Sequence, residues 1–112
     1  MQAQKNLEGA IDAFKRATTL QPNSGDAQTA LAETLFLKGD YKQAIISYQR
    51  LIEINPQNPQ AYYKLAAALK KDNRQSDAIA ALEKARDLYR SQGQSEGVQK
   101  AESALRELKP SS

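Results

Sequence analysis

Apolar residues recur along this chain at the three- and four-residue spacing of one face of an α-helix. The stretch 39–56 shows the pattern most clearly, because a glycine turn precedes the apolar face and a proline follows it. The apolar positions of this stretch are Ala44, Ile45, Tyr48, Leu51 and Ile52. Such a pattern between two stop signals predicts an amphipathic helix whose apolar face is buried.

The same criteria predict five further helices, which makes six in all. We expect them at about Asn6 to Leu20, Asp26 to Lys38, Pro59 to Lys71, Gln75 to Ser91, and within residues 94–109. In the last of these, Val98, Ala101, Leu105 and Leu108 form one apolar stripe surrounded by charged residues. A terminal helix with a polar outer face is what a repeat array needs at its end.

Turn residues mark the boundaries of these helices. Ser24, Asp40 and Asn58 precede predicted helices, and their side-chain oxygens can accept backbone N–H groups that are otherwise unpaired. Gly39 follows a predicted helix, and Asn73 occupies the equivalent place one repeat later. Both residue types tolerate the left-handed backbone that often ends a helix.

The helices form a repeat with one fixed period. Ala10, Ala44 and Ala78 are 34 residues apart (44−10 and 78−44). Five more columns keep the same step: Ile11, Ile45 and Ile79; Phe14, Tyr48 and Leu82; Pro22 and Pro56; Leu31 and Leu65; Leu35 and Leu69. A 34-residue period built from two helices indicates a helix-turn-helix solenoid.

This pattern resembles the tetratricopeptide repeat family. The first matching copy carries Leu31, Ala32, Gly39, Asp40, Tyr41, Ala44, Ile45, Tyr48, Asn55 and Pro56. The second copy carries Tyr62, Leu65, Ala66, Leu69, Ala78, Leu82 and Ala85, and it has Arg90 where the first has a proline. The resemblance implies an all-α, right-handed superhelical solenoid of antiparallel helix pairs, with about two and a half repeats and a C-terminal capping helix.

The length of 112 residues predicts a single domain. Within it we expect the second half of a truncated repeat at 6–22, full repeats at 25–58 and 59–92, and a capping helix at 94–109. The chain thus starts mid-repeat, either because it is a fragment or because its first helix packs against something else. Since a partner helix is missing, Ile11, Phe14 and Ala17 are expected to be uncovered and to mediate self-association.

The composition argues against catalysis. With no His and no Cys, the chain lacks the commonest general base, the thiol nucleophile and the usual zinc ligands. The five glycines are too scattered for a phosphate loop, and nearby acids such as Asp72 and Asp77, or Glu102 and Glu107, have no apolar pocket around them. We therefore expect no enzymatic activity, no cofactor and no metal.

A peptide-binding groove is the predicted functional surface, because first helices line the concave face in this family. The candidates are the residues of two first helices that avoid the core stripe: Thr29, Glu33, Phe36, Leu37, Gln60, Tyr63, Lys64, Ala67, Lys70 and Lys71. Tyr63 is the most informative, because Tyr62 beside it falls on the core stripe. The alternative is that Phe36 and Tyr63 pack against each other between repeats.

The charges allow two interpretations of one basic cluster. Sixteen Lys and Arg against thirteen Asp and Glu give a net charge of +3, with the signs mixed along nearly every segment. Lys64, Lys70, Lys71 and Arg74 form the one local cluster. It is either a solvated face or an anchor for acidic groups of a peptide.

These observations predict a non-catalytic protein-interaction module that binds a peptide or a partner helix. The alternative is a regulatory or scaffolding segment cut from a larger enzyme or membrane-complex assembly factor. Nucleic acid is not an expected partner, because a helical-repeat base code needs matching readers in every repeat. The absence of a long apolar segment predicts no membrane span. We expect a cytoplasmic location, and a membrane-anchored or exported parent protein is the alternative.

Overall fold

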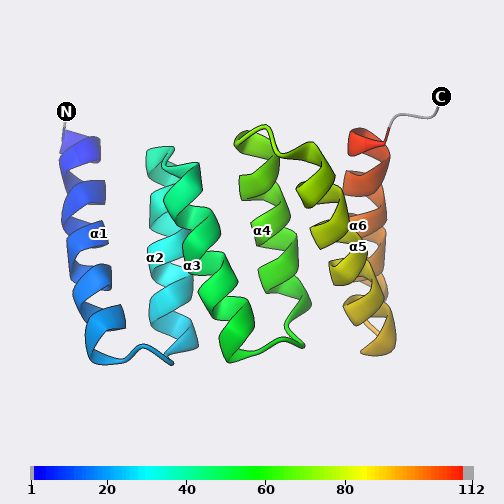
Figure 1. The fold of residues 1–112 in the computed structure, drawn as a ribbon, viewed down its shortest axis with the longest axis horizontal. Helices are drawn as coiled ribbons and strands as arrows, with labels where there is room; N and C mark the ends of the chain where they lie inside the picture. Colours follow the sequence, from blue (N-terminus) through cyan, green and yellow to red (C-terminus); the bar gives the residue numbers. More distant parts are fainter. Residues whose placement is uncertain (1, 110–112) are drawn as a thin grey trace. The chain divides into compact units, whose positions relative to one another are not determined.

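The computed structural model describes residues 2–109, with side chains from Asn6 onward. These residues form six α-helices and no strand (Figure 1): α1 Gln2–Leu20, α2 Gly25–Lys38, α3 Tyr41–Ile54, α4 Pro59–Lys71, α5 Gln75–Ser91 and α6 Ser95–Leu108. The predicted all-α class and the number of helices are confirmed. The bounds of α4 and α5 are those predicted, whereas α1 begins at Gln2 and not at about Asn6.

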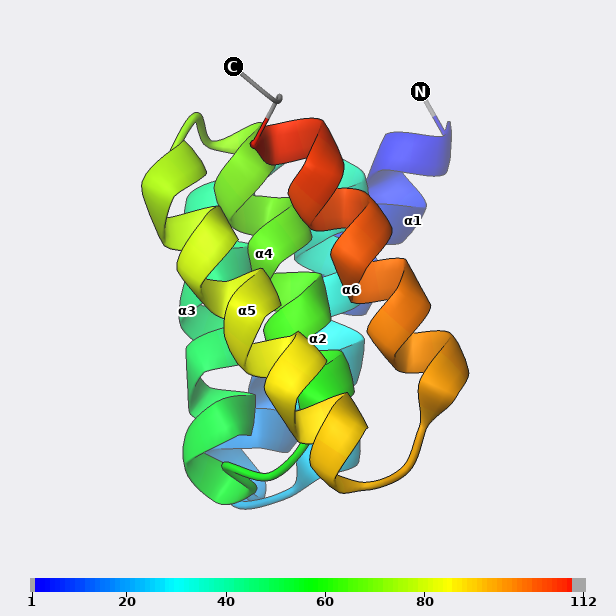
Figure 2. The same cartoon turned by 90° about the vertical axis from the view of Figure 1, so that its right-hand side faces the viewer.

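The helices fall into two compact units, which meet between Pro56 and Gln57 in the sequence. In the first unit, α2 is the middle helix and packs against α1 and α3. In the second unit, α5 is the middle helix and packs against α4 and α6; Figure 2 shows α5 and α6 running side by side. Each unit therefore contains consecutive antiparallel helices joined by short turns.

The helix boundaries arise from the predicted capping residues. The side-chain oxygens of Ser24, Asp40 and Asn58 accept backbone N–H bonds of 3.2, 3.2 and 3.1 Å from the first turns of α2, α3 and α4. Gly39 ends α2 with φ 92°, and Asn73 follows α4 with φ 61°. Both left-handed positions were predicted from the repeat, and both are confirmed.

The core of the first unit follows the predicted apolar faces. Its buried apolar residues are Ile11, Leu31, Ala32, Leu35, Ala44, Ile45, Tyr48 and Leu51. Gln28 and Thr34 are also buried, which the apolar pattern did not predict. Their polar atoms bond to local backbone, because Gln28 Nε2 donates to Pro22 O at 3.5 Å and Thr34 Oγ1 donates to Ala30 O at 2.7 Å.

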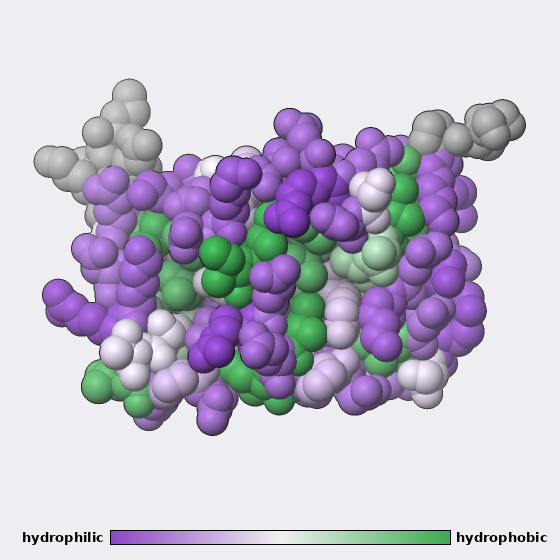
Figure 3. Space-filling model, in the orientation of Figure 1, coloured by the Kyte–Doolittle hydropathy of each residue, from purple (hydrophilic) through white to green (hydrophobic). Residues whose placement is uncertain are grey.

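One prediction about α1 is wrong. Ile11 is 4% exposed, because α2 packs on the side of α1 that carries it. Phe14 and Ala17 are half-buried and not fully uncovered. The largest apolar exposure on α1 is at its end, where Leu20 is 82% exposed and Figure 3 shows apolar surface at the lower tip of the helix.

The core of the second unit is rich in alanine. Its buried apolar residues are Ala61, Leu65, Ala66, Ala68, Leu69, Ala78, Ala81, Leu82, Ala85, Leu88, Tyr89, Ala101, Leu105 and Leu108. Small side chains let neighbouring helices approach closely, whereas Ala80 is exposed on α5 and takes no part in this packing. Tyr62 and Val98, both predicted on core stripes, are half-buried.

Polar contacts fix α6 against α5. Gln75 Nε2 donates a hydrogen bond of 2.6 Å to the Leu108 carbonyl, and Lys109 Nζ lies 2.8 Å from Glu83 Oε2. The surface over α6, at the right-hand edge of Figure 3, is hydrophilic. The predicted capping helix is thus present, with an apolar inner stripe and a polar outer face.

Candidate functional site

The second unit carries a small apolar hollow between α4 and α6. It has a volume of about 120 Å³ and is lined by Tyr63, Ala66, Ala67, Lys70, Leu82, Ala104, Glu107 and Leu108. The walls come from α4 and α6, and the buried Leu82 of the middle helix α5 forms the base. The hollow exists because its walls carry alanines, whose side chains leave open the space that larger ones would fill.

An ion pair bridges α4 and α6 at one end of this hollow. Lys70 Nζ lies 3.8 Å from Glu107 Oε2, and the two side chains are 54% and 73% exposed. Exposed pairs of this kind contribute roughly 0 to 1 kcal/mol. If a ligand displaced this ion pair, the second unit would therefore lose little stability.

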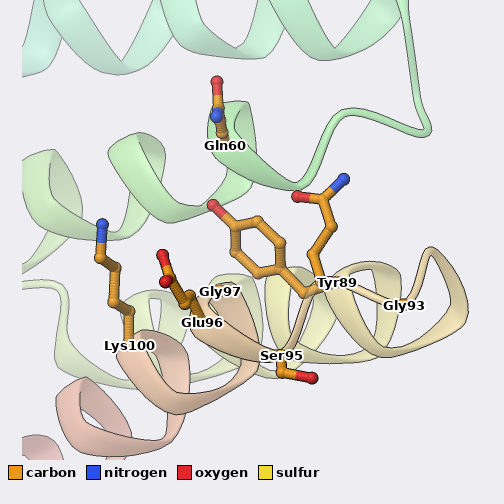
Figure 4. Close-up of a pocket in the computed structure, with 8 residues that line it drawn as sticks. Gln60, Tyr89, Gly93, Ser95, Glu96, Gly97 and Lys100 are labelled. Carbon is orange, nitrogen blue, oxygen red and sulfur yellow. The ribbon is translucent and has the colours of Figure 1, made fainter.

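A second hollow lies at the other end of the same two helices. Because α4, α5 and α6 are consecutive antiparallel helices, the first turns of α4 and α6 lie at the same end of the unit. The hollow there has a volume of about 450 Å³ (Figure 4) and is lined by Gln60, Tyr89, Gly93, Gln94, Ser95, Glu96, Gly97 and Lys100. In contrast to the first hollow, polar side chains dominate its lining.

Tyr89 of α5 projects into this polar hollow. It is 7% exposed, and its ring lies directly against Gly97, where an added Cβ would overlap ring carbons. Burial, and secondarily the neighbouring Tyr63, raise the pKa of the Tyr89 hydroxyl. Tyr63 lines the apolar hollow, and both hollows lie along α4 and α6, so we refer to the two hollows together as the α4–α6 groove.

Four of the ten residues predicted from sequence line the α4–α6 groove. These are Gln60 at the polar end and Tyr63, Ala67 and Lys70 at the apolar end. Lys64 and Lys71 lie on the same helix and line neither hollow.

The four predicted residues on α2 form a separate group in the first unit. Phe36 packs edge-on against Tyr41, with ring centroids 5.2 Å apart and an interplanar angle of 68°. Leu37 is 73% exposed. Thr29 is half-buried, and Glu33 lies close enough to Tyr48 of α3 to contribute to a raised Tyr48 pKa.

Sequence reasoning missed the part of the groove contributed by α5 and α6. Leu82 was assigned to the repeat pattern, and Tyr89 was not singled out. Ala104 and Lys100 belong to a helix that was interpreted as a cap. One signal was available, since a glycine inside a helical pattern often marks close packing, as Gly97 does here.

Several of the charged residues singled out from sequence take part in ion pairs. Within the basic cluster, Lys70 pairs with Glu107, and Arg74 Nε lies 3.4 Å from Asp77 Oδ2. Glu102 lies 3.6 Å from Arg90 of α5. These pairs link helices or stabilise a helix start, which is a structural use of both signs of charge.

Two kinds of site are absent from the residues that the structure describes. No group of three or more acidic, His or Cys side chains among them could hold a metal ion. None of the helices between Gln2 and Leu108 combines the length and the apolar character that crossing a membrane requires.

Comparison with known families agrees with the repeat and the helix pairs. A TPR repeat family model matches residues 32–73, and two tetratricopeptide repeat models match residues 1–46 and 60–91. The chain belongs to the tetratricopeptide repeat (TPR) family. The matches cover both units, including α1.

Similar proteins share this fold in different settings. A TPR repeat-containing protein of Picosynechococcus is 38% identical over 86 residues, which are 77% of this chain and 22% of that protein. The chain thus spans about a fifth of the length of this curated relative. The type III secretion translocator chaperone SycD of Yersinia enterocolitica is 20% identical, with a TM-score of 0.84 over 94% of this chain and 73% of SycD. The TPR2B domain of yeast Sti1 is 17% identical, with a TM-score of 0.83 over 95% and 85%.

Proposed function

We propose that this TPR chain is a non-catalytic protein-interaction module that binds an extended peptide in the α4–α6 groove. The observation that carries the proposal is the apolar hollow, which three alanines leave open above Leu82 and which Tyr63 flanks. A hollow of about 120 Å³ has room for one aliphatic side chain of a ligand. The exposed Lys70–Glu107 pair at its end offers both a cation and an anion to the polar groups of a peptide.

The similar structures support this choice of ligand. SycD has been solved in complex with a peptide of the translocator YopD; that structure is 19% identical, with a TM-score of 0.80 over 94% of this chain and 81% of SycD. The Sti1 domain has been solved in its complex with pHsp70. The SycD structure is a peptide complex of the same fold, so a peptide is the ligand class that we infer for this chain.

The candidates on α2 remain part of the proposal as a second surface in the first unit. Phe36 and Leu37 give it apolar area, and Glu33 gives it a negative charge. Lys64 and Lys71 are proposed to contact the outer edge of a peptide held along α4. None of these residues is needed to form the apolar hollow.

Filling the hollow is the direct test. Peptides are first selected from a random ten-residue display library on the purified chain, and the best one is titrated by fluorescence anisotropy. Ala67→Leu places a larger side chain in the hollow, and we expect it to weaken binding by at least about tenfold, the equivalent of roughly 1.4 kcal/mol. Tyr63→Ala is expected to act in the same direction, because it removes an aromatic wall.

Ala80→Leu is the matched control, since it makes the same change at an exposed position of α5. Its affinity should stay within about twofold of the parent chain, which is below 0.5 kcal/mol. Circular dichroism checks that all variants keep their helix content. Equal affinity of Ala67→Leu and Ala80→Leu would show that the hollow is not the binding site.

A second candidate function is that of a scaffolding segment within a larger enzyme or assembly factor. The specific observation in its favour is that the chain spans 22% of the Picosynechococcus relative. Reading the parent open reading frame tests it, because a catalytic or membrane domain there would transfer the main activity to that domain. Under this proposal the groove positions a partner for the rest of the protein.

Self-association through α1 is a further part of the proposal. With Ile11 buried, it depends on the half-buried Phe14 and Ala17. Sedimentation velocity at high concentration should detect a dimer that Phe14→Ser weakens. A strict monomer would exclude this contact.

A further inference from the structure

The base of the apolar hollow carries a different kind of residue from the equivalent positions elsewhere in the repeat. Leu82 forms this base and is 3% exposed. The residues one and two repeats earlier are Tyr48 and Phe14 (82−34 and 48−34), so the other two copies carry an aromatic side chain there. Tyr48 is also 3% exposed, which places this column in the core. A leucine at a position that otherwise holds a ring leaves space above it.

One wall of the hollow differs in the same way. Ala67 of α4 lines the hollow, and the residue one repeat earlier is Glu33 of α2 (67−34). Burial, and secondarily the carboxylate of Glu33, raise the pKa of the Tyr48 hydroxyl, so Glu33 and Tyr48 lie near each other in the first unit. The second unit therefore has a smaller residue at both of these neighbouring positions. The hollow is the space that the two larger side chains would take.

The lining of the hollow selects a ligand side chain by its size and not by its charge. The apolar part of the lining consists of three alanines, two leucines and Tyr63. The two charged residues, Lys70 and Glu107, have opposite signs and pair with each other at 3.8 Å, so they favour neither an acidic nor a basic side chain. An apolar side chain enters such a hollow without leaving a polar group unpaired.

The volume of the hollow limits which apolar side chain can enter it. An apolar cavity of about 150 Å³ is the size that binds a benzene ring. The hollow measures about 120 Å³, which is smaller, and the buried Leu82 closes it from below. An aromatic side chain of a peptide would have to displace Leu82, whereas the branched side chain of leucine, isoleucine or valine is smaller than a ring and fits above it.

We propose that Leu82 is the specificity-determining residue of the apolar hollow, and that the bound peptide inserts a leucine, isoleucine or valine there and no aromatic residue. The inference rests on the proposed function, because it concerns the same peptide in the same hollow. The size of residue 82 sets the depth of the hollow. A smaller residue at this position should admit a ring, and a tyrosine, which is the residue of α3 in this column, should close the hollow.

Parallel peptide selections test this inference. The random ten-residue display library is selected on the parent chain and on Leu82→Ala, and the two sets of peptides are compared. We expect the peptides from the parent chain to share Leu, Ile or Val at one position, and those from Leu82→Ala to carry Phe, Tyr or Trp at the corresponding one. Leu82→Tyr should bind the peptides from the parent chain at least about tenfold more weakly, because the larger side chain occupies the hollow.

The ratio of two affinities is the sharper measurement, because partial unfolding of a variant weakens the binding of both peptides equally. The peptide from the parent chain, and a version with Phe at the shared position, are titrated against each chain by fluorescence anisotropy. The parent chain should prefer the aliphatic peptide by at least about tenfold, since the ring clashes with Leu82. Leu82→Ala should reduce this preference to less than about twofold or reverse it.

Leu88→Ala is the matched control for Leu82→Ala. It makes the same change in the same helix, at a side chain that is 6% exposed and lines neither hollow. It should therefore keep the preference of the parent chain. Circular dichroism checks the helix content of each variant. If Leu82→Ala does not fold, Leu82→Val makes a smaller change and should shift the preference in the same direction.

Three results would overturn the assignment of Leu82: an aromatic residue at the shared position of the peptides from the parent chain, no shared position, or the same preference in the Leu82 variant and in Leu88→Ala. If peptides with any of these results still lose affinity with Ala67→Leu, the proposed function stands without this inference. If no peptide binds more tightly to the parent chain than to Ala67→Leu, the proposed function fails as well.

Discussion

The two units use equivalent positions of the repeat for different contacts. In the first unit, Phe36 and Tyr41 form an aromatic pair across the turn between α2 and α3. One repeat later, 34 residues on, the same positions are Lys70 and Gln75. Lys70 pairs with Glu107, and Gln75 donates a hydrogen bond to the Leu108 carbonyl, so both bind α6.

The middle helix explains why one of the two units contains the described groove. In the first unit the middle helix is α2, the first helix of its repeat, and its neighbours α1 and α3 are both second helices. In the second unit the middle helix is α5, a second helix, and its neighbours α4 and α6 are both first helices. The groove that we propose lies between two first helices that pack against one second helix, and within a single unit the second unit has that arrangement.

Of the variants that test this comparison between the units, one that weakens the packing of α6 should have the largest effect on stability. Leu105 is 7% exposed and lies on the inner stripe of α6. Leu105→Ala should lower the free energy of unfolding by about 2 to 5 kcal/mol, the usual cost of a large-to-small change in a core. Urea denaturation followed by circular dichroism measures it.

The control for this variant is Leu37→Ala, which makes the same change at a side chain that is 73% exposed. It should change stability by less than about 0.5 kcal/mol. Similar losses for the two variants would mean that α6 is not held by its apolar stripe.

Two glycine substitutions should change the free energy of unfolding by smaller amounts. The one in the second unit should lower it, and the one in the first unit should raise it. Gly97→Ala forces Cβ into the Tyr89 ring, and overpacking of this kind costs about 1 to 3 kcal/mol. Gly9→Ala, in α1, meets no atom within 4 Å and should stabilise by roughly 0.5 to 1 kcal/mol through helix propensity. Thermal unfolding of both variants checks the signs, and a Gly97→Ala chain as stable as the parent would contradict the close contact.

The structure around these two glycines also illustrates how much of the fold could be predicted from the sequence. The bounds of α4 and α5 followed from local signals, such as the Asn58 cap before Pro59, which depend on few neighbours. The Tyr89–Gly97 contact could not be predicted, because it depends on how α5 and α6 cross, and α5, with 17 residues, is longer than the equivalent helix α3, with 14. Ile11 was misjudged for a related reason, since its burial depends on how α2 packs against α1.

The smallest effect concerns the pH dependence of the first unit. Burial, and secondarily the carboxylate of Glu33, raise the pKa of Tyr48 from 10.0 to about 12. Above pH 10 the unfolded chain loses this proton while the folded chain keeps it, so stability falls as the pH rises from about 10 to 12. The loss should reach about 1 kcal/mol by pH 11.

Tyr48→Phe removes the group and should flatten this part of the stability curve. Urea denaturation of both chains at pH 9, 10 and 11 gives the comparison. Parallel curves would show that Tyr48 ionises equally in the folded and unfolded states.

Amide chemical-shift mapping tests the central claim most directly. The isotope-labelled chain is titrated with the peptide selected from the random library, and each backbone amide is followed. We predict that the largest shifts occur in α4 and α6, from Gln60 to Lys70 and from Ser95 to Leu108, with smaller ones at Leu82 and Tyr89. Shifts concentrated in α1 and α3, with α4 and α6 unchanged, would contradict the assignment of the groove to the second unit.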